Sequence, residues 1–219
     1  MNLKRVTILL LIMGVVLFWT MKSANENDID ADELQNETIH QPKQGKGDII
    51  IIEFSDFKCP YCGLFERNIK PKLAQSFIKN NKVEFRYVNV LLHGKESERG
   101  ARAAHAVNLV APNQYWQFHE LLFQSQPKSK NDVGQTTWLT DDLIRKLTNQ
   151  LALSNNQKER ILKLYQDDKG EAAKQAKADH QLAKAYGVPQ VPMLYINGKA
   201  VKHMTNYQDV EIAIKEALN

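Results

Sequence analysis

Cysteine is scarce in this 219-residue chain, which contains only two, Cys59 and Cys62. A structural zinc site needs about four Cys, His or acidic ligands. The sequence has no second Cys pair and no His pair at ligand spacing. The histidines of the folded part are scattered along it, at His93, His105, His119, His180 and His203. The sequence therefore predicts no metal site, and the two cysteines must be explained by their own chemistry.

Basic residues exceed acidic residues only slightly, and they form no stripe with interleaved aromatic residues. The chain has 29 Lys and Arg against 25 Asp and Glu, for a net charge of +4, which we interpret as an ordinary solvated surface. The sequence therefore predicts no binding of nucleic acid. No internal repeat is visible, and the composition is that of a globular protein with one good core, or of one domain that carries an insertion.

The two cysteines stand together in Phe57-Lys58-Cys59-Pro60-Tyr61-Cys62, directly behind the apolar run of residues 49–54. If Cys59 caps a helix, Pro60 fits its first position, because the N–H that proline lacks would be unpaired there anyway. The sulfurs then lie one turn apart, and Cys59 faces the positive end of the helix dipole, which favours a thiolate. We therefore expect a redox pair in which Cys59 is the exposed nucleophile and Cys62 the resolving thiol.

A static disulfide between Cys59 and Cys62 is the alternative interpretation. Such a bond would close a loop of only about four residues, and a disulfide constrains the unfolded chain more when the loop is long. The sequence therefore favours a redox role for the pair over a structural one.

The N-terminal segment has the pattern of an export signal. Lys4 and Arg5 precede the uncharged residues 6–21, a run that lies between a signal-peptide core and the ~20 residues of a full membrane span. The best cleavage candidate, Lys22-Ser23-Ala24, has lysine where a small residue is preferred. We therefore expect residues 1–22 to be an uncleaved membrane anchor with its basic end in the cytoplasm; a cleaved signal peptide, followed by secretion, is the alternative. In both cases the folded part is expected outside the cytoplasm, where disulfides persist.

Residues 23–46 carry six acidic residues against two lysines and show no apolar periodicity. This composition predicts a flexible linker. We expect it to tether the folded domain, residues 47–219, to the membrane.

Two strands and a helix are predicted around the cysteines. Residues 49–54 form a short, bounded, β-branched run, which predicts a strand buried on both faces, as in a parallel sheet. A helix is expected over residues 60–80 with a bend at Pro71, followed by a second strand over residues 83–91. Together these elements complete a βαβ unit.

The C-terminal part carries a strong hairpin signal. Residues 193–196 and 199–201 flank Asn197-Gly198, a pair that suits a type I′ turn, and a final helix is expected over residues 207–218. About 100 residues between the second strand and this hairpin are almost wholly helical in character. Caps and apolar spacing predict helices there, over residues 97–110, 112–124, 140–151, 154–165 and 170–186.

Three segments carry a resemblance to a known family. They are Glu53-Phe54-Ser55-Asp56-Phe57-Lys58-Cys59-Pro60-Tyr61-Cys62, Gly187-Val188-Pro189-Gln190-Val191-Pro192 and Tyr195-Ile196-Asn197-Gly198. With the order of the predicted elements, they resemble the DsbA family, in particular its exported Gram-positive DsbA/BdbD branch. Glutaredoxins share Cys-Pro-Tyr-Cys, but the export signal and the helical stretch favour DsbA. The resemblance covers about residues 48–219 and implies an α/β thioredoxin fold with a helical domain inserted at about residues 95–170.

The resemblance also implies roles for residues near the cysteines. Pro192 matches the family's cis-proline, which leaves the backbone of Val191 free to pair with a substrate strand; the alternative is an ordinary strand-opening proline. Glu53 matches a buried acid that could exchange protons with the resolving thiol; the alternative is a glutamate that reaches solvent at the strand end. Pro60 and Tyr61 are expected to modulate thiolate stability, and Tyr61 to contact substrate.

The implied activity is that of an exported thiol-disulfide oxidoreductase. It would donate the Cys59–Cys62 disulfide to reduced substrate proteins through a mixed disulfide at Cys59, without a metal or organic cofactor. We expect its partners to be reduced, unfolded or partly folded exported proteins, and a quinone-linked membrane partner that reoxidises it. Two alternatives stay open: a reductase or isomerase on the same fold, and a surface binding module whose disulfide is only structural.

The direction of the reaction follows from the expected surroundings of Cys59. The helix N-terminus favours its thiolate, and the only acids expected nearby are Glu53 and Asp56, which we take to be a surface residue. Since a stabilised thiolate makes the disulfide more oxidising, we expect an oxidant stronger than thioredoxin.

Overall fold

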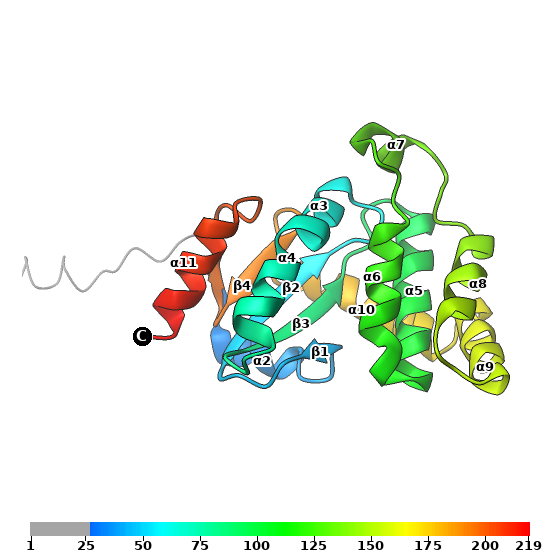
Figure 1. Cartoon of the computed structure of the whole chain (residues 1–219), viewed down its shortest axis with the longest axis horizontal. Coiled ribbons are helices and arrows are strands. Elements are labelled where there is room, and N and C mark those ends of the chain that lie inside the picture. The colour runs from blue at the N-terminus through cyan, green and yellow to red at the C-terminus, as the bar shows by residue number, and fades with distance from the viewer. Residues whose placement is uncertain (1–26) are drawn as a thin grey trace, which may run out of the picture.

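The structure is a computed structural model of the chain and describes residues 27–219. The expected membrane anchor or signal peptide, residues 1–22, lies outside the described residues. Among residues 27–219, no helix is both long enough and apolar enough to cross a membrane. Figure 1 shows two lobes side by side, a sheet covered by helices and a group of packed helices.

A five-stranded mixed sheet forms the first lobe. Its strands are β1 (Lys43–Gln44), β2 (Ile49–Ser55), β3 (Val83–Asn89), β4 (Met193–Ile196) and β5 (Lys199–Ala200). Their order is β1-β3-β2-β4-β5, with β2 parallel to β3 and antiparallel to β4. Every residue of β2 is buried, which confirms the strand predicted to be covered on both faces.

The helices cover the sheet and build the second lobe. They are α2 (Ala31–Glu37), α3 (Pro60–Asn68), α4 (Lys70–Leu73), α5 (Lys95–Val110), α6 (Tyr115–Gln124), α7 (Lys130–Gln135), α8 (Asp141–Gln150), α9 (Asn155–Gln166), α10 (Glu171–Ala185) and α11 (Tyr207–Ala217). In Figure 1, α4 and α11 lie in front of the sheet and α10 lies behind it. The second lobe contains α5, α6, α8 and α9, and α7 projects beside the N-terminal end of α3.

The hairpin between β4 and β5 has the predicted turn. Asn197 and Gly198 both have positive φ, 46° and 77°, as a type I′ turn requires. Asn197 also ties the turn to β2, because its Oδ1 accepts a hydrogen bond from the Ile50 N–H at 2.9 Å. The turn thus helps to fix the register of β4 against the central strand.

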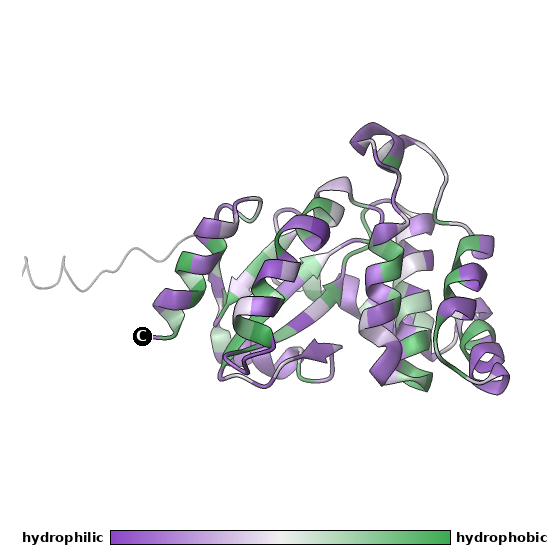
Figure 2. Cartoon of the chain, in the orientation of Figure 1, coloured by the Kyte–Doolittle hydropathy of each residue, from purple (hydrophilic) through white to green (hydrophobic). Residues whose placement is uncertain are grey.

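The helices of the second lobe begin at the predicted caps. Thr140 accepts a hydrogen bond from the Leu143 N–H at the start of α8, and Ser154 and Gln157 form a capping box at the start of α9. Hydrophobic and hydrophilic residues alternate along both helices in Figure 2. This is the pattern of helices that bury one face against a core.

The helix predicted over residues 60–80 is divided. α3 ends at Asn68, and Pro71 lies in the first turn of α4. A proline ring clashes with the carbonyl group four residues earlier and offers no N–H, so the break falls at Ile69, just before Pro71. The chain then continues through a π-helical turn at Ala74–Ile78. The predicted bend is therefore present as a break between two helices.

The expectation of a flexible linker over residues 23–46 is wrong for residues 28–44, which we call the N-terminal strap. The strap forms α2 and β1 and reaches both edges of the sheet. At one edge the Ile29 N–H donates to the Gly198 carbonyl at 2.8 Å, and at the other β1 pairs with β3. Leu34 of α2 is fully buried. One buried leucine among polar residues produces no periodicity, which explains why the sequence pattern did not reveal the strap.

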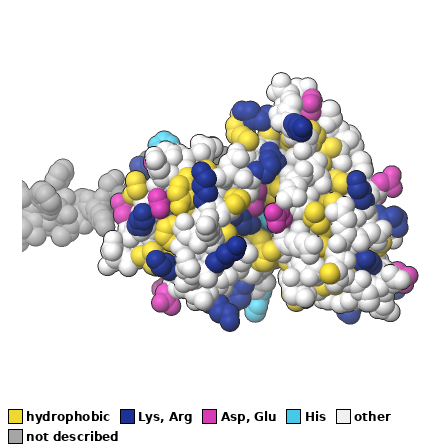
Figure 3. All heavy atoms as spheres, in the orientation of Figure 1, with side chains coloured by type: hydrophobic (Ala, Val, Ile, Leu, Met, Phe, Trp, Pro, Cys, Tyr) yellow, Lys and Arg dark blue, Asp and Glu magenta, His cyan; other side chains and the backbone are white. Residues whose placement is uncertain are grey.

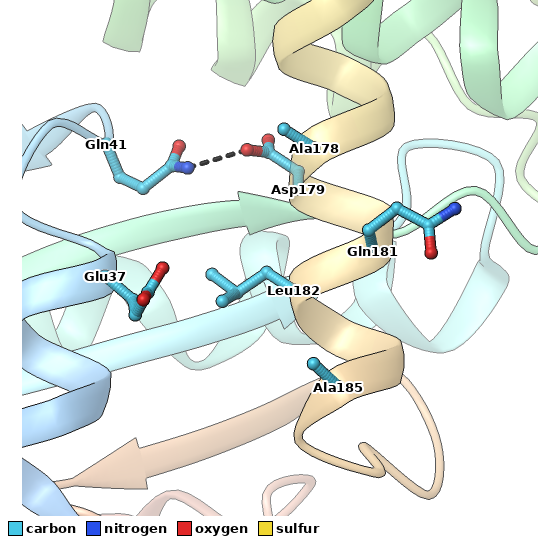
Figure 4. A pocket seen from close by; sticks show the side chains of 7 residues that line it. All are labelled: Glu37, Gln41, Ala178, Asp179, Gln181, Leu182 and Ala185. Carbon is cyan, nitrogen blue, oxygen red and sulfur yellow. Dashed lines mark hydrogen bonds between the residues drawn. The ribbon is translucent and has the colours of Figure 1, made fainter.

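Side chains of the sheet and of α10 hold the strap in place. The Arg86 guanidinium donates to the Gln35 carbonyl at 2.6 Å and to Thr38 Oγ1 at 3.1 Å. On the other side, the Gln41 amide donates to the Asp179 carboxylate at 2.6 Å, as Figure 4 shows. These contacts make the strap part of the folded domain.

We predict that Leu34→Ala lowers the free energy of unfolding by about 2 to 5 kcal/mol, because it leaves a cavity between the strap and the sheet. Ile39→Ala is the matched control, since this strap residue is 48% exposed and its loss should change stability by less than about 0.5 kcal/mol. Urea unfolding measures both. Equal effects of the two substitutions would show that the strap does not contribute to the core.

Candidate active site

The two cysteines lie in the first turn of α3, just after the central strand. Cys59 is the N-cap and Pro60 the first helical residue, as predicted. Both cysteines are free thiols, and the Cys62 N–H donates to Cys59 Sγ at 3.5 Å. The Asp56 carbonyl accepts from the Cys59 N–H at 2.9 Å. The turn that connects strand and helix is therefore held by hydrogen bonds on both sides of Cys59.

Cys59 is less exposed than the sequence led us to expect. Only 4% of this residue is accessible, against none of Cys62. Part of its cover is the loop before β4, because Cys59 Sγ lies 3.7 Å from the Val191 carbonyl oxygen. Cys59 is still the more accessible residue of the pair.

The surroundings of the two thiols shift their pKa values in opposite directions. A hydrogen bond from the Cys62 thiol, helped by the N–H groups of Cys62 and Tyr61, lowers the pKa of Cys59, although burial and the Asp56 carboxylate oppose this. Burial, and then the neighbouring Cys59, raise the pKa of Cys62 well above its ordinary value. The pair therefore favours a thiolate at Cys59 and a protonated thiol at Cys62.

Val191 and Pro192 lie beside the cysteines. The Val191–Pro192 peptide bond is cis, as the resemblance implies for Pro192. Pro192 is buried, whereas Val191 is partly exposed. This arrangement leaves part of the Val191 residue at the surface next to the Cys59 sulfur, where an extended peptide could pair with its backbone.

Asp56 is buried beneath the active-site turn, so its assignment as a surface residue is wrong. Its Oδ1 accepts from the Lys58 N–H at 2.8 Å. Its Oδ2 accepts from the Leu92 N–H at 3.0 Å, and from His93 Nδ1 and Ser97 Oγ, each at 2.8 Å. These four donors come from the turn, the loop after β3 and α5, and together they replace the water that a buried carboxylate would lose.

The helical lobe holds the same turn from the other side. Gln126, which follows α6, donates from Nε2 to the carbonyls of Phe57 and Cys59 at 2.8 and 3.0 Å. Its Oε1 accepts from Arg67 of α3 at 3.1 Å. Gly63 permits this close approach, because a Cβ there would lie 1.8 Å from Gln126 Oε1. The active-site turn is therefore clamped between the two lobes.

Lys58 forms a second bridge from the turn to the helical lobe. Its buried ammonium group forms an ion pair with Glu96 of α5 and donates to the Thr136 carbonyl. It also lies 5.4 Å from the centre of a Trp138 ring, within the range of a cation–π interaction. The charge of Lys58 is thus already balanced by partners other than the cysteines.

Glu53 is fully buried in β2, so the alternative in which it reaches solvent is wrong. Neither of its carboxyl oxygens has a hydrogen-bond partner of ordinary geometry among the described residues. Burial first, and then the negative charge of Glu66, raise the pKa of Glu53 well above its ordinary value. The Ser55 side chain lies near enough to act on the pKa of both Glu53 and Cys62. Burial therefore favours the protonated form of Glu53 over the carboxylate.

Sequence reasoning missed an ionic cluster beside Glu53. Glu66 of α3 lies 3.1 Å from Lys70 Nζ and 3.0 Å from His119 Nε2 of α6. Burial opposes ionisation of Glu66, but His119 and Lys70 lower its pKa to about 2. Burial lowers the pKa of His119 to about 4. The four-residue spacing of Glu66 and Lys70 could have indicated a pair, but only the fold brings His119 to it.

Exposed apolar side chains lie close to the cysteines. Tyr61 is 51% exposed and Leu92 is 54% exposed. The Lys130 ammonium of α7 lies 5.1 Å from the centre of the Tyr61 ring. Leu92 is attached to the site through its backbone bond to Asp56. These residues provide exposed apolar surface on the segments that hold the active-site turn.

The charged side chains near the active-site turn form local pairs, Lys58 with Glu96 and His93 with Asp56, and they do not form an extended patch of one charge. On the face shown in Figure 3, Lys and Arg side chains are dispersed among uncharged and hydrophobic ones. Within residues 27–219, no group of three or more His, Cys, Asp or Glu side chains is arranged to hold a metal ion.

Comparison with known proteins agrees with this geometry. The thioredoxin family model matches residues 44–216. Disulfide bond formation protein D of Bacillus subtilis is 32% identical over 182 residues, which cover 81% of this chain and 77% of that protein. The crystal structure of oxidised BdbD from Bacillus subtilis covers 81% of this chain and 92% of its own, with a TM-score of 0.70 and 32% identity.

A more distant relative shares the fold. The thiol-disulfide exchange protein α-DsbA2 from Wolbachia pipientis superposes with a TM-score of 0.66 at 15% identity, covering 86% of this chain and 94% of its own. The match over most of the chain and the 32% identity to the Bacillus subtilis protein establish the family. The chain belongs to the thioredoxin family, in the branch of the BdbD and DsbA-like disulfide oxidoreductases.

Proposed function

We propose that this protein disulfide oxidoreductase donates the Cys59–Cys62 disulfide to reduced substrate proteins. A substrate thiolate attacks the Cys59 sulfur, the bond between the two cysteines breaks, and its electron pair leaves on the Cys62 sulfur. A second substrate thiolate then attacks the substrate sulfur of the mixed disulfide. The substrate gains a disulfide, and Cys59 leaves as a thiolate. The substrate is oxidised by two electrons, and the enzyme is reduced by two.

The opposite pKa shifts of the two cysteines carry this proposal. A thiol with a lowered pKa is the better leaving group, so release of the oxidised substrate is favoured when Cys59 is the atom that leaves. Hydrogen bonds to the Cys59 sulfur also stabilise the reduced enzyme. Stabilising the reduced form makes the disulfide a stronger oxidant.

Glu53 has the properties needed to supply the proton that the Cys62 sulfur takes up in this reaction. In the first step Cys62 leaves as a thiolate in a fully buried position, where a charge is strongly disfavoured. The raised pKa of Glu53 favours its protonated form. We assign to it the transfer of this proton toward Cys62 along the side of Ser55.

The surface around Cys59 fits an extended segment of an unfolded protein. The Val191 backbone could pair with the segment on one side of the mixed disulfide, next to Pro192. The exposed side chains of Tyr61 and Leu92 would contact its apolar residues. We therefore assign substrate contact to Val191, Pro192 and Tyr61, and a modulating role to Pro60.

The site of action is proposed to be the outer side of the cell membrane. The charged and apolar pattern of residues 1–22 supports export, and oxidising compartments are where disulfides persist. We propose that residues 6–21 anchor the protein, with a secreted form as the alternative. Reduced exported proteins are its substrates, and a quinone-linked membrane protein would return Cys59 and Cys62 to the disulfide.

Iodoacetamide should modify Cys59 and not Cys62 in the reduced native protein, because only Cys59 combines some exposure with a lowered pKa. Its pKa should lie below the ~8.5 of a free cysteine. Peptide mass mapping and a thiolate absorbance titration measure the two quantities. Preferential modification of Cys62 would reverse the assigned roles.

Glu53→Gln should stabilise the protein at neutral pH. When a carboxyl has a higher pKa in the folded than in the unfolded protein, the folded protein loses stability as the pH rises from the unfolded pKa of about 4.3 toward the folded pKa. Glutamine stays neutral, so the variant does not lose this stability. The difference in free energy of unfolding between Glu53→Gln and wild type should therefore grow with pH above about 4.3 and vanish below that pH. Urea unfolding across this range measures it, with the exposed Glu120→Gln as control; a parallel pH dependence of wild type and Glu53→Gln would contradict the assignment.

The same substitution should slow reduction of the Cys59–Cys62 disulfide by a thiol peptide, since the leaving sulfur loses its proton donor. Glu120→Gln should leave this rate unchanged.

The reduction potential of the pair should lie above the thioredoxin value of about −270 mV, toward the DsbA value of about −120 mV. A redox titration against glutathione measures it. The oxidised protein should speed refolding of a reduced, disulfide-requiring protein, and Cys59→Ser should abolish this. A potential at or below that of thioredoxin would favour a reductase.

A further inference from the structure

Asp56 touches both cysteines through its backbone and carries a buried carboxylate that the proposed reaction does not use. The Asp56 side chain is fully buried. Its backbone carbonyl accepts from the Cys59 N–H at 2.9 Å, and its backbone N–H lies 3.5 Å from Cys62 Sγ. A negative charge at this place opposes the thiolate that the reaction needs at Cys59. A positive charge next to Asp56 would therefore make the Cys59 thiolate more stable.

His93 is the donor to this carboxylate that can supply a charge. The other donors are the N–H groups of Lys58 and Leu92 and the hydroxyl of Ser97, which are all neutral. His93 Nδ1 lies 2.8 Å from Asp56 Oδ2, and 34% of the His93 side chain is exposed. The imidazole can therefore exchange protons with solvent while it stays bound to the carboxylate.

The other charged groups around His93 are occupied elsewhere. The Lys58 ammonium is paired with Glu96 of α5. His180 of α10 accepts from the Leu91 N–H through its Nδ1, so this nitrogen carries no proton, and burial and Lys184 lower its pKa. Of the groups that face this side of the turn, His93 is the one placed to titrate against Asp56.

We propose that His93 is a positioning residue that offsets the charge of Asp56, so that protonation of His93 couples the pH of the surroundings to the stability of the Cys59 thiolate. The coupling is reciprocal: if the thiolate favours protonated His93, protonated His93 favours the thiolate by the same factor. This inference rests on the proposed role of Cys59 as the reacting sulfur.

The direction of the pH dependence follows from the contacts of His93. The hydrogen bond to Asp56 raises the pKa of His93, and the charges of Asp56 and Cys59 raise it further, while burial and the charge of Lys58 oppose this. Below this raised pKa, the positive charge of the His93 imidazolium offsets the negative charge of the Asp56 carboxylate. As the pH rises above the pKa, His93 becomes neutral, and the Asp56 charge then disfavours the Cys59 thiolate without compensation. The support for the Cys59 thiolate is therefore present below the raised pKa of His93 and is lost above it.

The test compares alkylation of Cys59 by iodoacetamide in reduced wild type and His93→Gln over a range of pH. Glutamine can still donate a hydrogen bond to Asp56 but carries no charge. At about pH 6 the variant should react about three to ten times more slowly, the effect of a charge a few ångström away near a protein surface, and by about pH 9 the two rates should converge. His180→Gln, on the same side of the turn, is the matched control and should react like wild type.

His93→Arg provides the complementary test, because it places a permanent positive charge at a partly exposed position. In His93→Arg, Cys59 should be alkylated at the wild-type rate at about pH 6. Above the pKa of His93, Cys59 of this variant should be alkylated faster than Cys59 of wild type. If His93→Gln does not fold, this variant decides alone.

Identical pH profiles for folded wild type and His93→Gln, or an arginine variant that keeps the wild-type pH step, would overturn the inference and leave His93 as a neutral hydrogen-bond donor. Failure of the proposed function would look different, because Cys59 would then resist alkylation in wild type at every pH.

Discussion

Strand β2 is buried along its whole length between β3 and β4, and the active-site turn takes its position from the end of this strand. The backbone pairing of β2 continues to its last residue, since the Val90 N–H, just after β3, donates to the Ser55 carbonyl at 2.7 Å. Asp56 and Cys59 follow at once. Because a strand paired on both sides cannot slip without moving its whole buried face, the start of α3 is held at one place relative to the sheet.

The same burial produces the chemistry of the site. A carboxyl and a thiol that lie in a low-dielectric interior resist ionisation, which raises the pKa of both Glu53 and Cys62. Cys59, at the rim, instead receives the N–H groups of a helix start, which favour its thiolate. One strand-to-helix junction thus separates a protonated inner thiol from an ionisable outer thiol a single turn away.

The helical lobe takes part in this junction. Gln126 holds the carbonyls of Phe57 and Cys59, and Lys58 is bound by Glu96. These contacts join residues far apart in the chain, so the geometry of the turn depends on how the two lobes pack. A rigid turn keeps the two sulfurs in reach of each other through the redox cycle, which is the preorganisation that thiol exchange needs.

Local signals in the sequence were sufficient for much of the fold. The helix start at Cys59 and Pro60, the caps at Thr140 and Ser154, and the Asn197-Gly198 turn all follow from interactions within a few residues. The strap was not predictable in this way, because Leu34 is its one fully buried hydrophobic side chain and the partners of the strap, Arg86 and Asp179, lie far along the chain.

The sequence by itself determined that two thiols would lie one turn apart at a helix N-terminus, and that Glu53 would lie in a buried strand. Both results depend on backbone geometry over a few residues. Only the tertiary structure decided that Asp56 is buried with His93 bound to it, and that Glu66, Lys70 and His119 meet beside Glu53. The physical reason is that a buried charge is stable only where the fold brings donors or counter-charges to it, and no local pattern specifies which distant residues those will be.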